Sequence, residues 1–199
     1  MVNLSVLTRI DAMVLAAGRS TRTGSQNKLL LALDGKPLVA HVVDATLASS
    51  IHQVHVITGY QRDDLKDALG DRPVRYIHNP VYHLGMGSSI NSGVKGLSDS
   101  VSGAILCLAD MPWVHASHID QLIKHFSPEA VCAPYFNDKR GHPVLFPKNW
   151  FARLSAIEGD TGARQLLEKT SGQVIKVQMT DNAILRDINH TNDLTSQVR

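Results

Sequence analysis

Residues 15–28 form a loop of small residues that carries three cations and has the composition of a phosphate-binding loop. The segment is LAAGRSTRTGSQNK, and it continues an apolar run, 12–17, that is typical of a buried parallel strand. Gly18 lets backbone N–H groups approach a ligand more closely than a residue with a side chain would. The positive charge comes from Arg19, Arg22 and Lys28. We therefore expect this loop to bind the phosphates of a ligand.

The loop differs from two familiar phosphate-binding patterns. In a Walker A loop the second glycine is followed directly by Lys and Ser or Thr, whereas here Ser25, Gln26 and Asn27 separate Gly24 from Lys28. The dinucleotide pattern GxGxxG fails because Ser20 stands at its second glycine. A glycine-containing turn with solvated cations is the alternative interpretation. Position favours a ligand site, because ligands of open α/β sheets usually bind at the carboxyl ends of the strands.

Strand-like apolar runs alternate with segments whose apolar residues repeat at helical spacing. The expected strands are 12–17, 54–58, 74–78, 104–109, 130–133, 143–146 and 173–179. The expected helices are 37–47, 61–69, 88–97, 117–126, 149–157 and 160–169, with a loop at 137–140. Repeated βα units predict an α/β fold of three layers, an open and mostly parallel sheet with helices on both faces. The loops after successive strands should then meet at one edge.

The bulk composition predicts one compact domain. The chain has 199 residues, of which 43% are hydrophobic and 19% charged, enough to bury a sizeable core. A net charge of +2 gives no basis for nucleic-acid binding, and no apolar run is long enough to span a bilayer. Cys107 and Cys132 lie in apolar stretches and are expected to be buried thiols rather than metal ligands. We expect a cytoplasmic protein without a membrane partner.

Asp110 is placed for metal chemistry. It ends the apolar run 104–109, so its carboxylate should lie where a buried strand opens to the ligand edge, and Pro112 ends strand pairing just beyond it. Mg²⁺ is usually held by one or two carboxylates, with water and substrate phosphates completing its coordination. A carboxylate that merely caps the following turn is the alternative.

Several motifs together resemble a known family. The spacing LAAGxSxRxGxxxK is similar to the signature of nucleotidyltransferases that join an NTP to a phosphorylated acceptor. The chain most resembles the molybdenum cofactor cytidylyltransferases and the related molybdopterin-guanine dinucleotide biosynthesis protein A-like transferases. The other motifs in family order are GMGSSI at 85–90, LADMP at 108–112, GHPVLF at 141–146, GDTGAR at 159–164 and DINHTNDL at 187–194. These motifs cover nearly the whole chain.

The resemblance implies a Rossmann-like nucleotidyltransferase fold and a Mg²⁺-dependent activity. The expected reaction transfers CMP from CTP to molybdopterin and releases pyrophosphate, and a molybdoenzyme is a possible partner that receives the product. Residues 1–199 would form a single NTP transferase domain. Its N-terminal part would bind the nucleotide, and residues from about 137 to 199 would bind the acceptor and close the site.

The resemblance also assigns a second metal ligand. Asp187 matches the family's partner of Asp110 on the metal, although the family usually continues Asp-Ile-Asp where this chain has Asn189. Asn189 could present a carbonyl oxygen but brings no charge, so a site that used it would hold Mg²⁺ less strongly. An N-cap network for a helix starting near Thr191 is the alternative role of this segment.

The nucleotide-binding positions lie in the first loop and at the ends of later strands. We assign Arg22, Lys28 and Asp110 to catalysis. The nucleotide-binding residues are Leu15, Ala16, Ala17, Gly18, Arg19, Ser20, Lys28, Gly59, Gly87, Ser88, Ser89 and Asp110. The segment 85–89 helps to select the nucleotide in the family, and Ser88 as a simple helix N-cap is an equal alternative.

The acceptor-binding positions lie in the second half of the chain. They are Gly141, His142, Asp160, Gly162 and Arg164. A helix that begins near Asp160 would expose free N–H groups, and Arg164 one turn later would bind a phosphate with its guanidinium. His142 could donate to the pterin or its phosphate, although a lone histidine is more often structural.

The expected mechanism needs little acid–base chemistry. A phosphate oxygen of the acceptor attacks the α-phosphorus of the NTP in line, while Arg22 and Lys28 offset charge on the α-phosphate and the departing pyrophosphate. Three alternatives remain open at this stage: a GTP-dependent guanylyltransferase of the same fold, an NAD(P)H-dependent oxidoreductase derived from the family, and a non-catalytic chaperone of the molybdenum cofactor. The presence of Asp110 disfavours the oxidoreductase.

Overall fold

The structure is a computed structural model that describes residues 8–19, 27–160, 162–169 and 171–189. Its main sheet has the strand order β10-β7-β9-β6-β1-β4-β5, and β8 pairs with β7 outside this path. The strands are β1 (Ile10–Ala16), β4 (Gln53–Thr58), β5 (Arg75–His78), β6 (Gly103–Leu108), β7 (Val131–Phe136), β8 (Lys139–Arg140), β9 (Val144–Pro147) and β10 (Val174–Gln178). A small separate ribbon pairs β2 (Ala32–Leu33) with β3 (Lys36–Pro37).

Most neighbours in the sheet are parallel, as the sequence predicts. β1 lies parallel to β4 and β6, β4 lies parallel to β5, and β10 lies parallel to β7. The antiparallel strands are β9, which pairs with both β6 and β7, and the short β8, which pairs with β7. The loop expected at 137–140 is a tight hairpin instead, since Asn137 and Asp138 adopt positive φ and let β8 fold back on β7.

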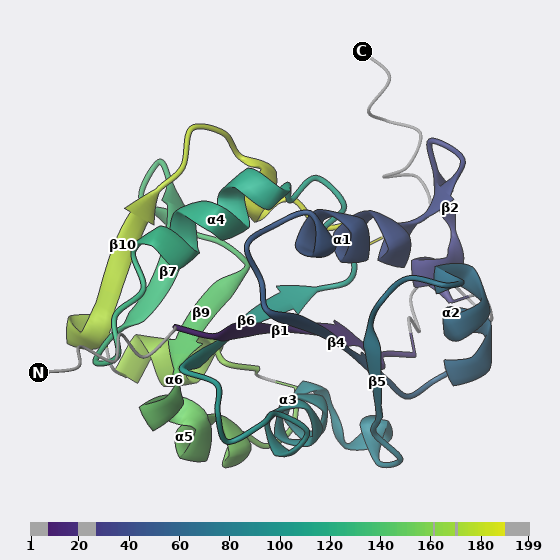
Figure 1. Cartoon of the computed structure of the whole chain (residues 1–199), viewed down its shortest axis with the longest axis horizontal. Helices are drawn as coiled ribbons and strands as arrows, with labels where there is room; N and C mark the ends of the chain where they lie inside the picture. Colours follow the sequence, from purple (N-terminus) through teal and green to yellow (C-terminus); the bar gives the residue numbers. More distant parts are fainter. Residues whose placement is uncertain (1–7, 20–26, 161, 170, 190–199) are drawn as a thin grey trace, which may run out of the picture.

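Within the described residues, six α-helices cover the two faces of the sheet (Figure 1). One face packs against α1 (Leu38–Leu47), α2 (Arg62–Leu69) and α4 (Ala116–Lys124), and the other against α3 (Met86–Lys95), α5 (Phe151–Ser155) and α6 (Arg164–Lys169). The single-turn 3-10 helices are 28–30, 82–84, 148–150, 171–173 and 183–185. Each face has its own cluster of buried apolar side chains, so the sheet separates two cores. The predicted three-layer α/β architecture is confirmed.

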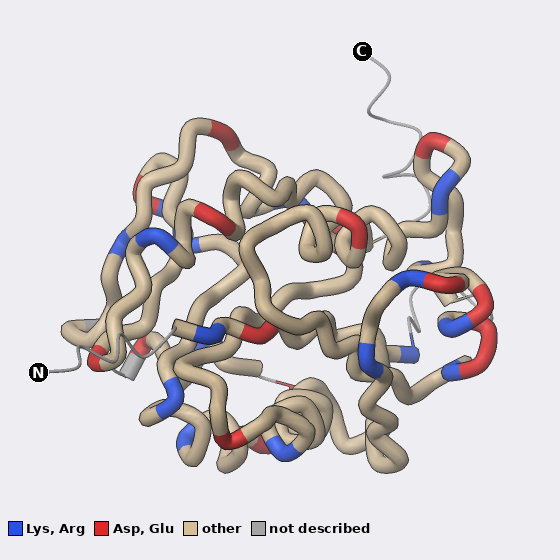
Figure 2. The backbone as a smooth tube through the Cα atoms, viewed as in Figure 1, with Lys and Arg blue, Asp and Glu red and all other residues tan. Residues whose placement is uncertain are grey.

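Charge is dispersed over the described residues rather than gathered on one face. Figure 2 shows lysine and arginine interspersed with aspartate and glutamate, and α2 is the most densely charged element in this view. Among the described residues, no helix is long and apolar enough to cross a membrane.

The chain after β10 returns to the end of β6 and docks there. The backbone N–H of His142 donates to the carbonyl of Ile184 (2.9 Å), and the N–H of Ile188 donates to the carbonyl of Asp110 (2.9 Å). A Cβ atom at Gly141 would overlap the carbonyl of Ile184, so only glycine allows this approach. The docking brings residues 187–189 to the strand edge at which Asp110 lies.

Gly141→Ala should therefore loosen this docking and destabilise the protein. We expect a loss of about 1–3 kcal/mol of unfolding free energy, the usual cost of forcing an extra methyl group into a packed contact. Chemical denaturation measures it. Gly172→Ala is the matched control, because a Cβ there meets nothing within 4 Å. Equal stabilities of the two variants would contradict the docking role of Gly141.

Candidate functional site

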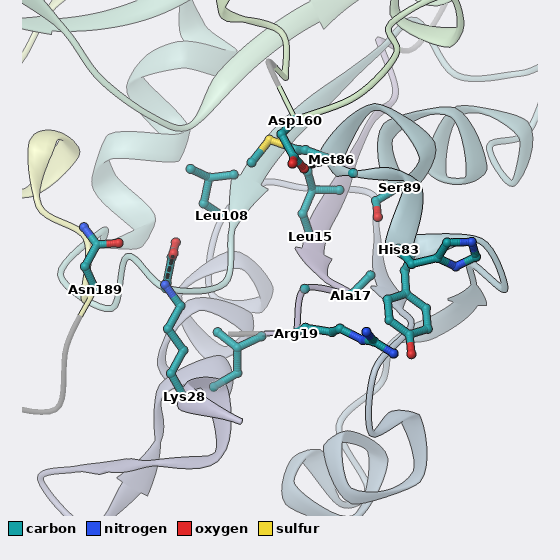
Figure 3. Close-up of a pocket in the computed structure, with 15 residues that line it drawn as sticks. Leu15, Ala17, Arg19, Lys28, His83, Met86, Ser89, Leu108, Asp160 and Asn189 are labelled. Atoms are coloured by element: carbon teal, nitrogen blue, oxygen red, sulfur yellow. Dashed lines mark hydrogen bonds and ion pairs between the residues drawn. The ribbon is translucent and has the colours of Figure 1, made fainter. Parts of the chain in front are cut away.

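A pocket of about 490 Å³ opens at the carboxyl ends of β1 and β6 (Figure 3). Its walls come from the ends of these strands, the 3-10 turn at 28–30, the segment between β5 and α3, the turn before α6, and the returning C-terminal segment. The lining residues are Leu15, Ala17, Gly18, Arg19, Lys28, Leu29, Tyr82, His83, Gly85, Met86, Ser89, Leu108, Asp110, Asp160 and Asn189. The pocket lies at the edge where the sequence places the chemistry.

Lys28 and Asp110 form an ion pair in this pocket. The Lys28 Nζ donates to Asp110 Oδ2 at 2.7 Å and to the carbonyl of Ile188 at 2.8 Å. The two charged side chains are only 15% and 22% exposed, so solvent screens the pair weakly. Asn27 fixes the start of the turn that carries the lysine, because its Oδ1 accepts from the N–H of Leu29. The sequence analysis assigned both residues to the site, and in the structure they form an ion pair.

The oxygen donors at this edge are suited to Mg²⁺. Of the two carboxylate oxygens of Asp110, Oδ2 accepts the hydrogen bond from Lys28. Asp187 is exposed, and its carboxylate accepts a hydrogen bond from the amide of Asn189 at 2.8 Å. Within the described ranges, no group of three or more His, Cys, Asp and Glu side chains could hold a metal ion. Two carboxylates therefore fit a cation that takes most of its ligands from water and substrate phosphates.

The first loop only partly falls within the described residues. Leu15, Ala17, Gly18 and Arg19 line the pocket, and the Arg19 guanidinium lies over the ring of Tyr82 at 5.7 Å from the centroid. Ala16 is buried in β1 next to them and does not line the pocket. The predicted residues Ser20 and Arg22 lie outside the described residues.

The segment expected to select the nucleotide contributes less to the pocket than predicted. Ser89 lines the pocket, but Gly87 and Ser88 do not. Gly87 packs on the backbone of the turn before α6, where a Cβ would be 2.5 Å from the Ile157 oxygen, and its N–H donates to the Gly159 carbonyl. The Ser88 hydroxyl donates to the Gly85 carbonyl at 2.8 Å. Gly87 and Ser88 thus set the position of α3. The alternative role of Ser88 as the N-cap is wrong, because Gly85 is the N-cap of α3 and the Ser88 hydroxyl donates to its carbonyl from inside the helix.

Gly59 also acts through a neighbour. It does not line the pocket, and a Cβ at this position would lie 2.6 Å from the Cβ of Tyr82. Gly85 and Met86, from the segment expected to select the nucleotide, line the pocket, and the sequence interpretation assigned no role to the lining residues Leu29, Tyr82, His83 and Leu108. Tyr82 and His83 follow β5 and Leu108 ends β6, and that position was the available signal, since strand ends meet at this edge.

The predicted acceptor residues divide into two groups. Asp160 lines the pocket, and its Oδ1 accepts from the N–H of Met86 at 3.3 Å. Gly162 has a positive φ of 56°, and a Cβ there would be 2.7 Å from the Met86 sulfur. The helix expected from residue 160 begins only at Arg164, because this glycine turn precedes it. The guanidinium of Arg164 is exposed and paired with Glu168 at 2.8 Å, so it does not reach the pocket in this structure.

Gly141 and His142 lie behind the pocket rather than on its wall. Burial lowers the pKa of His142 to about 4; Asp110 and Asp187 oppose this shift, and Arg140 adds to it. The Nδ1 atom is buried without a hydrogen-bond partner among the described residues. His142 is therefore a neutral imidazole at pH 7, close to both candidate metal ligands.

The lowered pKa of His142 should make folding stability depend on pH. The unfolded chain takes up this proton near pH 6.5 and the folded chain only near pH 4, so stability should fall as the pH drops through this window. His142→Gln should flatten the loss between these limits, measured by denaturation at successive pH values. The exposed His78→Gln serves as the control and should leave the curve unchanged. If His142→Gln also leaves the curve unchanged, the imidazole is not buried as a neutral group.

Comparison with known proteins connects this pocket to a family. Residues 12–174 match the MobA-like NTP transferase domain. The purine catabolism protein PucB of Bacillus subtilis is 31% identical over 173 residues, which cover 80% of each chain. The nicotine blue oxidoreductase of Paenarthrobacter nicotinovorans is 24% identical over 187 residues, covering 90% of this chain and 91% of the relative.

A solved structure has a similar fold. Rv0371c from Mycobacterium tuberculosis gives a TM-score of 0.84 at 22% identity, over 94% of this chain and 96% of that one. In its complex with manganese the TM-score is 0.74 at 20% identity, over 86% and 88% of the two chains. The matched family region contains the described pocket residues except Asn189.

Proposed function

This chain belongs to the MobA-like NTP transferase family and is a nucleotidyltransferase, and from that premise we propose that it transfers CMP from CTP to a molybdopterin acceptor and releases pyrophosphate. The observation that carries the proposal is the Lys28–Asp110 pair at the edge of a pocket bordered by Gly18 and Arg19. One cation and one carboxylate at the strand ends provide what phosphoryl-type transfer requires, positioning and charge stabilisation.

The reaction exchanges one bond for another at the α-phosphorus. A phosphate oxygen of the acceptor forms the new P–O bond, and the bond to the bridging oxygen breaks, so that pyrophosphate leaves with the electron pair. Arg22 and Lys28, together with Arg19, neutralise the triphosphate, and Lys28 must exchange its contact with Asp110 for a phosphate oxygen to do so. No base is required, because the attacking oxygen is already anionic at neutral pH.

The metal in this proposal is Mg²⁺, held by Asp110 and Asp187. When bound, it supplies positive charge that the carboxylates and triphosphate share. The manganese complex of Rv0371c supports a divalent cation in this fold. Asn189, which lines the pocket and donates to Asp187, orients that carboxylate instead of adding a third charge.

The choice of CTP and molybdopterin is supported by the motifs of the chain. GMGSSI contributes Gly85, Met86 and Ser89 to the pocket wall, whereas no residue of GHPVLF lines it. The single-domain organisation with residues from about 137 to 199 on the acceptor side is part of the same proposal. Asp160 and Asn189 are the described pocket residues from that half of the chain. The proposal also includes a molybdoenzyme partner that receives the product, and a cytoplasmic location.

The oxidoreductase remains the second candidate because of one relative. The alignment with the nicotine blue oxidoreductase covers 90% of this chain. The name of this relative describes a redox enzyme, so we keep that reaction class as an alternative. The ion pair of Lys28 with Asp110 favours nucleotidyl transfer, since hydride transfer needs no metal-binding carboxylate at the strand ends. The two candidates differ in their ligands.

Thermal stabilisation by CTP, GTP, ATP, UTP and NADPH, each with and without Mg²⁺, should separate them. A ligand that binds only the folded chain raises the melting temperature, by an amount set by its concentration relative to Kd. We expect the largest Mg²⁺-dependent rise with CTP, and its loss in Asp110→Asn. A preference for GTP would indicate guanylyl transfer, and a metal-independent response to NADPH alone would refute the transferase. Nucleotide binding without release of pyrophosphate from CTP in the presence of molybdopterin would indicate a chaperone.

Lys28→Met should lower turnover far more than stability. Loss of a preorganised charge on the transferred group typically costs about 100- to 1,000-fold in kcat. Pyrophosphate release measures the rate, and differential scanning calorimetry measures the melting temperature. Lys124→Met is the control at an exposed lysine at the end of α4, and it should change neither quantity. Proportionate losses of turnover and stability in Lys28→Met would assign the lysine a purely structural role.

A further inference from the structure

The segment between β5 and α3 is held rigidly at its base. Asn79 is fully buried, and its amide nitrogen donates to the hydroxyls of Ser88 at 2.9 Å and Ser89 at 3.0 Å. Its Oδ1 accepts from the N–H of Val81 at 3.0 Å. One buried amide therefore ties both ends of the segment together and fixes the direction of the residues between them.

Tyr82 is the aromatic ring that this closed segment presents to the pocket. The Cβ, Cγ and Cδ1 atoms of Tyr82 lie directly against Gly59, where an added Cβ would come within 2.6–2.8 Å of them. Its ring is tilted against Tyr60, with centroids 6.4 Å apart, and meets the edge of His83 at 6.1 Å. A half-buried tyrosine with backbone behind it and rings beside it is a preorganised flat surface.

Arg19 covers this surface. Its guanidinium is 5.7 Å from the ring centroid, and the same residue follows Gly18 in the first loop. A cation–π contact of this kind at a partly exposed site is weak compared with a charge-assisted contact to phosphate. A bound triphosphate can therefore draw the guanidinium away and leave the ring for another partner.

The two sides of the pocket differ in chemistry. In Figure 3, Lys28 and Asn189 lie on one side, His83 and Ser89 on the other, and Arg19 between them. Charge is concentrated at the lysine side, where Asp110 also lies. The side next to Tyr82 presents rings, the exposed thioether of Met86 and a serine hydroxyl, which suits a planar heterocycle with polar edges.

We propose that Tyr82 is the stacking surface for the base of the nucleotide, and that Arg19 leaves its ring for the triphosphate when the nucleotide binds. This inference rests on the proposed nucleotidyl transfer and adds its base subsite. Stacking recognises the flat ring of any base, so Tyr82 sets the affinity for the base. The choice among bases is left to polar contacts at the edges.

Calorimetric titration with CTP and with inorganic tripolyphosphate, both with Mg²⁺, tests the proposal. Tyr82→Leu should weaken CTP binding about tenfold, the usual effect of losing one stacked base, and leave tripolyphosphate binding equal or tighter because Arg19 is already free. Tyr82→Phe keeps the ring and should bind CTP within about twofold of the wild type. In turnover, Tyr82→Leu should raise KM for CTP with little change in kcat.

Tyr135→Leu is the matched control. Tyr135 also carries a cation over its ring, Lys176 at 5.1 Å, but it lies on β7 outside the pocket, so CTP binding should not change. Unchanged CTP affinity in Tyr82→Leu, or an equal loss for tripolyphosphate, would overturn the stacking role.

The same titration separates this inference from the proposed function. Wild-type protein that binds CTP no better than tripolyphosphate, yet still releases pyrophosphate, would refute the stacking surface alone. Protein that shows the base-dependent loss in Tyr82→Leu but no pyrophosphate release with molybdopterin would refute the proposed reaction alone.

Discussion

The contact of Lys28 with Asp110 and Ile188 is the interaction on which the site depends. One ammonium group joins three parts of the chain: the end of the first loop, the end of β6 and the segment that returns after β10. A charge so little exposed must be paired, because an isolated charge at this position would lose much of its hydration. The pairing therefore fixes this edge of the pocket and holds there the two charges to which the proposed reaction assigns roles.

The fold serves this contact by placing strand ends together. β1 and β6 are adjacent and parallel, so the first loop and the segment after Leu108 emerge at the same edge although about ninety residues separate them. The antiparallel β9 carries the chain behind this edge, where Gly141 allows the C-terminal return to approach closely. Close backbone approaches at Gly87 and Gly141 fit the segment after α5 and the C-terminal return against the rest of the structure.

The sequence pattern predicted most elements of the fold. Strand and helix positions in the first 136 residues agree within a few residues, because each apolar period extends over a whole buried face. Predictions were weaker afterwards: the helix expected from Asp160 begins at Arg164, and the 137–140 loop is a hairpin. Left-handed residues at Asn137, Asp138 and Gly162 cause these differences, and a polar turn composition does not reveal their φ angles.

The sequence likewise predicted some features of the site and not others. The sequence by itself was enough to predict a phosphate loop, Lys28 and Asp110 as candidate site residues at one edge of the sheet, because their residue types suit this chemistry and strand ends share an edge. Only the tertiary structure decided that Lys28 pairs with Asp110, that Gly87 and Gly59 serve packing, and that Tyr82 faces the pocket. Those outcomes depend on distances between segments far apart in the chain. Local residue patterns do not encode such distances, since they arise only when the two cores and the returning segment pack together.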